Sequence, residues 1–99
     1  MITLTVLYGT PDDVEKFDAY YSETHIPLAR AVPGLDDVRV TRFLPGPDGS
    51  AAEYHLMAQL SFADADAMGA AMSTDEGQAL AADVANLGVT PKMLVGSTE

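Results

Sequence analysis

The residue types best suited to chemistry gather around one histidine. His25 follows Tyr21 by four positions and precedes Pro27 by two. Side chains four positions apart lie on the same face of a helix, so the two rings can meet. Proline removes an N–H and its ring clashes with the carbonyl four residues back, so we expect the helix to stop or kink between Thr24 and Ile26. An imidazole beside such loosened backbone can exchange protons near neutral pH.

Two interpretations of His25 stay open. It can act as a general acid or base, or it can satisfy backbone groups that lose their helical partners at the kink. Spacing alone favours the second, structural interpretation.

Four tyrosines in a chain without tryptophan widen the candidate site: Tyr8, Tyr20, Tyr21 and Tyr54. Strand alternation directs Tyr8 and Tyr54 towards the helices, where Tyr21 and His25 are expected. The resulting cavity would be apolar, with a few hydroxyls and one imidazole, and would suit a planar, mostly apolar molecule with a carbonyl or hydroxyl. Ordinary core packing of the tyrosines is the alternative.

The elements that position these residues follow the order strand, helix, strand, strand, helix, strand. The first helix is expected to begin at Thr10-Pro11, and a helical stretch over 64–72 is followed by a second one, capped at Ser73, that runs towards Val84. Alternation and turn signals predict strands over 2–8, 35–44 and 53–62 and a last one that ends at Val95. We therefore predict one α+β domain over 1–99, a ferredoxin-like βαββαβ fold with a four-stranded antiparallel sheet and helices on one face.

The other face of this sheet is expected to pair with a second copy of the chain. It would collect apolar residues (Leu7, Phe43, Met57, Leu94) among polar ones (Thr5, Thr41, His55, Gln59, Thr90, Lys92). Such a face is too apolar for water and too polar for the core of a monomer. We therefore predict a homodimer through the sheet face, with His55 on the opposite side of the sheet from His25.

Composition excludes several classes of function. A formal net charge of −10, with five basic residues in 99, disfavours nucleic acids and anionic membranes as partners. The absence of cysteine excludes disulfides and thiolate chemistry, and two histidines on opposite faces make a metal site unfavourable. No phosphate-binding glycine pattern supports a nucleotide, so we expect no cofactor. Without a leader or a long apolar run, we expect a cytoplasmic location.

The run Tyr20–Leu28, with its histidine, proline and leucine, and the Val32–Leu35 segment resemble the signature of the EthD family. The opening Val6–Tyr8 and the closing Lys92–Val95 fit as well, so the resemblance covers nearly the whole chain. It implies a dimeric α/β barrel, in which two ferredoxin-like protomers face each other through their sheets and each holds a pocket between sheet and helices. The family's motif histidine corresponds to His25.

The resemblance also bounds the function. The family takes its name from a protein associated with ether degradation beside a cytochrome P450 system, and similar proteins are labelled reductases or dehydrate polyketides. It implies cofactor-independent acid–base or oxidoreductase chemistry (an oxidoreductase, lyase or isomerase) on a small apolar carbonyl or aromatic compound. The family's tyrosine corresponds to Tyr20 or Tyr21. In an enzyme we expect His25 to move a proton while Tyr21 or Tyr54 bonds the oxygen, so His25 and Tyr21 are the catalytic candidates and Tyr8, Tyr20 and Tyr54 the substrate-binding ones.

The chain departs from the related cofactor-free monooxygenases, since no asparagine or tryptophan is placed as in those proteins. A reductase activity would need a flavin or nicotinamide from outside. The alternative function is a non-catalytic binding or accessory protein for a small apolar metabolite.

Overall fold

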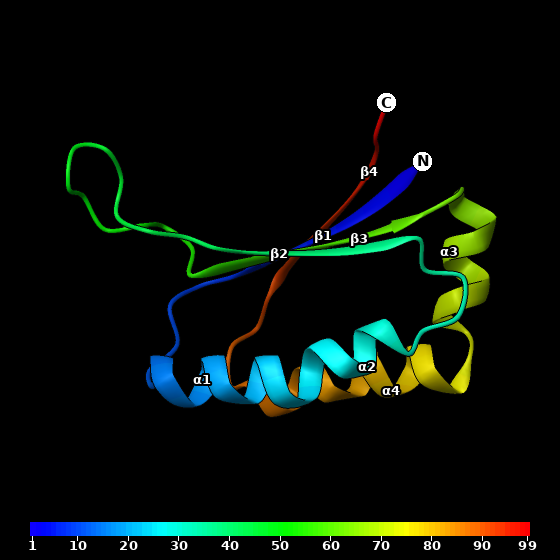
Figure 1. Cartoon of the computed structure of the whole chain (residues 1–99), viewed down its shortest axis with the longest axis horizontal. Coiled ribbons are helices and arrows are strands. Elements are labelled where there is room, and N and C mark those ends of the chain that lie inside the picture. The colour runs from blue at the N-terminus through cyan, green and yellow to red at the C-terminus, as the bar shows by residue number, and fades with distance from the viewer.

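The fold is built on a sheet whose strands are β1 (Ile2–Tyr8), β2 (Asp37–Arg42), β3 (Leu56–Phe62) and β4 (Lys92–Ser97). The computed structural model describes all 99 residues. The strands lie in the order β2-β3-β1-β4, and every neighbouring pair is antiparallel. The helices cover one face of this sheet (Figure 1). The predicted α+β, ferredoxin-like fold is confirmed.

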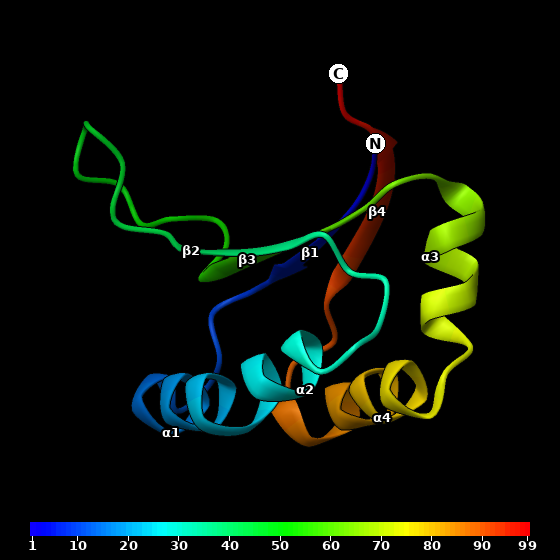
Figure 2. The same cartoon turned by 45° about the vertical axis from the view of Figure 1, so that its right-hand side comes forward.

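The helical segments are α1 (Val14–Tyr20), η1 (Tyr21–His25), α2 (Ile26–Arg30), α3 (Ala65–Met72), α4 (Asp75–Asp83) and η2 (Val84–Leu87). The run from α1 to α2 lies beside α4 beneath the sheet (Figure 1). Helix α3 stands upright at one end of the sheet and links β3 to α4 (Figure 2). None of these helices is both long and apolar enough to cross a membrane.

The kink predicted near Pro27 takes the form of a π-helical turn. The N–H of Ile26 donates to the carbonyl of Tyr21, five residues back, so each hydrogen bond of η1 spans one more residue than in an α-helix. Pro27, which has no N–H, then lies at the start of α2, where no intrahelical donor is needed. The helix therefore continues through the proline, with Tyr21 and His25 both buried at the ends of η1.

Both predicted helix starts are displaced. Helix α1 is capped by Asp13, not Thr10, because the Asp13 carboxylate accepts from the backbone N–H of Lys16 at 3.1 Å. Helix α4 is capped by Thr74, whose hydroxyl accepts from Gly77 N–H at 3.0 Å. The Ser73 hydroxyl instead donates to a carbonyl of α3, so Ser73 ends that helix.

The two faces of the sheet follow the predicted alternation within the strands. On β3, the residues that face the helices are all buried: Leu56, Ala58, Leu60 and Phe62. The predicted second and third strands extended further, over 35–44 and 53–62, whereas β2 and β3 are shorter. The intervening residues 43–55 form an arm that projects beyond the helices (Figure 1).

The prediction that His55 lies on the uncovered face is wrong. His55 lies in a bend just before β3, outside the regular alternation. Its Nε2 lies 2.7 Å from the Asp18 carboxylate of α1, and its ring meets Phe17 edge-on. The side chain is therefore on the helix side of the sheet, as His25 is.

Candidate functional site

A histidine and a carboxylate from two different helices form the centre of the site. His25 ends η1 and Asp83 ends α4. The His25 Nδ1 lies 2.8 Å from the Asp83 Oδ2, and only 5% of His25 and 7% of Asp83 are exposed. Burial of such a pair requires that each polar atom find a partner.

Asp83 has further partners on its other oxygen. The Tyr20 hydroxyl donates to Oδ1 at 2.5 Å, and the Asn86 amide donates to the same atom at 3.0 Å. Burial raises the pKa of Asp83, but the hydrogen bonds from Tyr20, Asn86 and His25 outweigh it and hold the pKa below the usual value. Asp83 is therefore a carboxylate near neutral pH, and an acceptor at both oxygens.

This carboxylate determines how the neutral His25 ring carries its proton. Because Asp83 can only accept, the proton of the neutral imidazole lies on Nδ1 and Nε2 is left as an acceptor. Nε2 makes no hydrogen bond within the protein. Every fully buried polar side-chain atom of the protein does have a hydrogen-bond partner. Nε2 is therefore not fully buried, and we assign it to the cavity that His25 lines.

The cavity lies between the sheet and the helices, with a volume of about 120 Å³. Its lining is apolar apart from the His25 imidazole and two tyrosine hydroxyls, and contains no charged residue: Leu4, Val6, Tyr8, Tyr21, His25, Ile26, Ala29, Val38, Ala58, Leu60, Met72, Leu80, Ala81, Val84 and Met93. The Tyr21 ring lies 5.0 Å from the His25 ring, and Tyr8 meets Tyr21 edge-on at 5.6 Å.

The two tyrosines of the cavity stay neutral. Burial raises the pKa of Tyr8 to about 12, although the neighbouring Tyr21 partly offsets this effect. Burial also raises the pKa of Tyr21, and the nearby Tyr8 hydroxyl adds to the rise. Both hydroxyls therefore keep their protons near neutral pH, and the hydrogen bond between them leaves capacity for one to a ligand.

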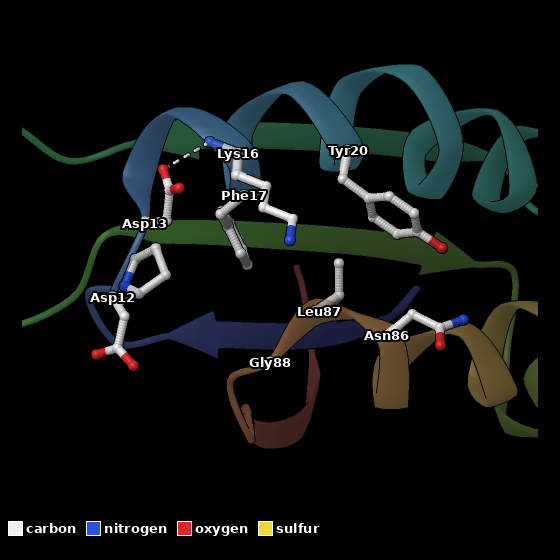
Figure 3. Close-up of a pocket in the computed structure, with 9 residues that line it drawn as sticks. Asp12, Asp13, Lys16, Phe17, Tyr20, Asn86, Leu87 and Gly88 are labelled. Atoms are coloured by element: carbon white, nitrogen blue, oxygen red, sulfur yellow. Dashed lines mark hydrogen bonds between the residues drawn. The ribbon is translucent and has the colours of Figure 1, made fainter.

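A larger surface groove, of about 280 Å³, lies between the start of α1 and η2 (Figure 3). Tyr20 and Asn86 face each other across it, and the Lys16 side chain extends into it (Figure 3). Its lining includes the carboxylates of Asp12 and Asp13 but no imidazole. We place the candidate site in the smaller cavity, because it is lined by an imidazole and the groove is not.

The structure brings some of the predicted site residues together and separates others. His25, Tyr21 and Tyr8 line one cavity. Tyr20 points away from it, into the groove, and contributes by holding Asp83. Tyr54 lies apart, in a shallow hollow lined by the arm. The catalytic and binding roles of all five stay predictions.

Asp83 is the residue that the sequence analysis missed. Leu80 and Leu87 are both buried, and Asp83 lies three positions after the first and four before the second. An acidic residue at this position on an apolar helix face needs a buried partner, which is the signal that could have identified it.

The chain belongs to the EthD domain family, whose match covers residues 11–88. It is 38% identical over 90 residues to an uncharacterised 11.0 kDa protein from the thcB-thcC intergenic region of Rhodococcus erythropolis, covering 87% of this chain and 82% of that protein. The predicted EthD resemblance is confirmed.

Solved structures give the same result for the fold. An ethyl tert-butyl ether D (EthD) family protein from Bacillus halodurans superposes with a TM-score of 0.93 at 35% identity, covering 100% of this chain and 99% of that one. A protein of unknown function from Bacteroides fragilis, described as dimeric with a ferredoxin-like fold, has a TM-score of 0.69 at 14% identity and covers 98% and 95%. The second likeness concerns the fold alone.

Proposed function

We propose that this EthD protein binds a small apolar carbonyl or aromatic compound in the His25 cavity and performs cofactor-independent acid–base chemistry on it. The observation that carries the proposal is the His25–Asp83 pair, which presents an unused imidazole nitrogen to an apolar cavity. A base held by a carboxylate beside an apolar cavity is a recurring arrangement for proton transfer.

The chemistry follows from the positions of these groups. His25 Nε2 would take a proton from the carbon beside a carbonyl, and the hydroxyl of Tyr21 or Tyr8 would donate a hydrogen bond to the carbonyl oxygen, where negative charge develops. Asp83 would stabilise the imidazolium that forms, because its Oδ2 already contacts Nδ1. The cavity contains no charged residue that would compete for the proton.

Deuterium exchange tests this proposal without knowledge of the natural substrate. A small cyclic ketone is incubated with the protein in heavy water, and its deuterium content is followed by mass spectrometry. We expect protein-dependent exchange that His25→Ala lowers by roughly a hundredfold, as for loss of a general base. His55→Ala is the matched control, since His55 also contacts a carboxylate but lies outside the cavity. Equal exchange by His25→Ala and the unaltered protein would reject the role of His25.

The same cavity also supports a second candidate, a non-catalytic binding protein. The observation in its favour is that His25 is the one imidazole in the lining, so no second imidazole is present to return the proton to another atom of the ligand. Binding of ketones or aromatic compounds without any deuterium exchange or product would favour this candidate.

We also propose that the protein is a homodimer joined through the open faces of the sheets. The strand register places two cations, Arg39 and Lys92, and one anion, Asp37, on this face. The chain has a formal net charge of −10, but this face has no excess of negative charge. Two copies can therefore meet there without repulsion between carboxylates. Leu94, on the same face, is 49% exposed. Sedimentation showing only a monomer at micromolar concentration would reject the dimer.

A further inference from the structure

We infer that the cavity selects a neutral single-ring compound that carries a hydrogen-bond donor, such as the hydroxyl of a phenol. The inference rests on the proposed binding role of the His25 cavity and narrows its ligand. It depends on three features: the proton arrangement that Asp83 imposes on His25, the size of the cavity, and its lack of charge.

The first feature is that His25 presents an acceptor and not a donor. Asp83 accepts the Nδ1 proton through Oδ2, so the neutral ring has no proton on Nε2. The hydroxyls of Tyr8 and Tyr21 can both donate and accept, so they do not distinguish donor ligands from acceptor ligands. Nε2 can only accept. A ligand that places a donor there makes a hydrogen bond, whereas a carbonyl placed there leaves two acceptors facing each other.

The second feature is size. The cavity measures about 120 Å³. An apolar cavity on the order of 150 Å³ accommodates benzene, so this one is suited to a single ring and not to a fused polycyclic compound.

The third feature is electrostatic. The lining has no cation, and the Asp83 carboxylate lies directly behind the imidazole. A carboxylate or phosphate ligand would therefore lose its hydration without gaining a positive partner. The donor on the ligand is accordingly a neutral group, such as a hydroxyl.

The network around Asp83 allows the preference to be inverted by one substitution. Tyr20 and Asn86 both donate to Oδ1. In Asp83→Asn these donors hold the amide oxygen at the Oδ1 position and turn its NH₂ towards His25 Nδ1. The imidazole must then accept at Nδ1 and carry its proton on Nε2, which changes the cavity from an acceptor to a donor.

Three probes of matched size test the inference: phenol, which donates; fluorobenzene, which lacks a donor; and cyclohexanone, which only accepts. Affinity is measured by ligand-observed NMR titration of the full chain. We expect phenol to bind about tenfold more tightly than the other two, as for one net hydrogen bond. Asp83→Asn should shift the preference to cyclohexanone, and His55→Ala should leave the preference for phenol unchanged.

The ¹⁵N spectrum of the imidazoles provides a measurement that does not depend on a variant. In its neutral state, the His25 ring should carry its proton on Nδ1. His55 contacts Asp18 through Nε2, so its neutral ring should show the reverse arrangement and serves as an internal reference. A His25 proton on Nε2, or on both nitrogens, would overturn the inference.

The outcomes of the titration separate the two proposals. Binding of all three probes with equal affinity, or a preference for cyclohexanone in the unaltered protein, would overturn the donor selectivity and leave the cavity as a binding site. If no probe binds, the proposed binding role of the cavity fails, and the selectivity fails with it.

Discussion

The His25 Nδ1 lies 2.8 Å from the Asp83 carboxylate, although 58 positions separate the two residues in the chain. Asp83 is the last residue of α4, and the negative end of a helix dipole is unfavourable for a carboxylate. The donors that surround Asp83 overcome this disadvantage, because Tyr20, Asn86 and His25 all bond to it. Several measurable consequences depend on this contact and on the packing around it.

Removal of the Asp83 carboxylate should destabilise the protein. Asp83→Ala leaves the buried Nδ1 proton of His25 without an acceptor, and the Tyr20 hydroxyl loses its partner. We expect the free energy of unfolding in urea to fall by about 1–3 kcal/mol. Glu53→Ala, on the exposed arm, is the control and should change it by no more than about 0.5 kcal/mol. Equal stability of the two variants would contradict a structural role for Asp83.

Asp83 should also contribute to acid sensitivity. Its pKa in the folded protein lies below the ordinary 3.8, so the unfolded chain binds the proton first as the pH falls. The stabilising contribution is complete above pH 3.8 and is lost as the pH falls through the folded pKa. Urea unfolding at a series of pH values should show a shallower acid dependence for Asp83→Asn than for the unaltered protein. Parallel curves would count against this prediction.

The opposite sign applies to Tyr8 in alkali. Its pKa rises from 10.0 to about 12 on folding, because the phenolate is disfavoured in the core. The folded state therefore retains its proton longer, and stability is lost as the pH rises from 10.0 to about 12. Tyr8→Phe should weaken this alkaline loss without abolishing it, since the pKa of Tyr21 is raised too. An unchanged alkaline slope would disprove the contribution of Tyr8.

Two glycines should respond to alanine in opposite ways. A Cβ at Gly77 would collide with the Ala71 carbonyl oxygen and lie 2.7 Å from the Met72 Cα, where α4 passes the end of α3. Gly77→Ala should therefore lower the free energy of unfolding by about 1–3 kcal/mol. Gly69, in α3, has open space around it, and Gly69→Ala should raise stability by about 1 kcal/mol. A destabilised Gly69→Ala, or a stabilised Gly77→Ala, would contradict this account.

A charge on the open sheet face should prevent dimerisation without unfolding the chain. Leu94→Glu places a carboxylate on β4 at a residue that is already half exposed in the protomer. We expect sedimentation velocity to show a monomer at micromolar concentration, with an unchanged circular dichroism spectrum. Val14→Glu, at an exposed residue of α1, is the control and should remain a dimer. Dimers of Leu94→Glu as stable as those of the control would contradict the proposed interface.

Local patterns in the sequence were sufficient for the architecture. Alternation identified β1 from Ile2 to Tyr8 and the buried face of β3, because successive side chains of a strand point to opposite faces of the sheet. Pro27 identified the irregular turn that contains His25, because a missing N–H acts within a few residues. The motif around His25 indicated the EthD family because all of its residues lie in one short run of the sequence.

Contacts between distant segments decided which side chains form the candidate site. Nothing near His25 in the chain indicates Asp83, which approaches it only because α4 packs beside α2 under the sheet. The bend at His55 turned that ring towards Asp18, and the arm carried Tyr54 away from the cavity. The sequence alone thus determined the fold and most of the candidate residues, but it missed Asp83 and placed Tyr54 and His55 on a strand that begins only at Leu56. Only the tertiary structure decided which of them meet, because hydrogen-bond partners across 58 positions leave no periodic trace in the sequence.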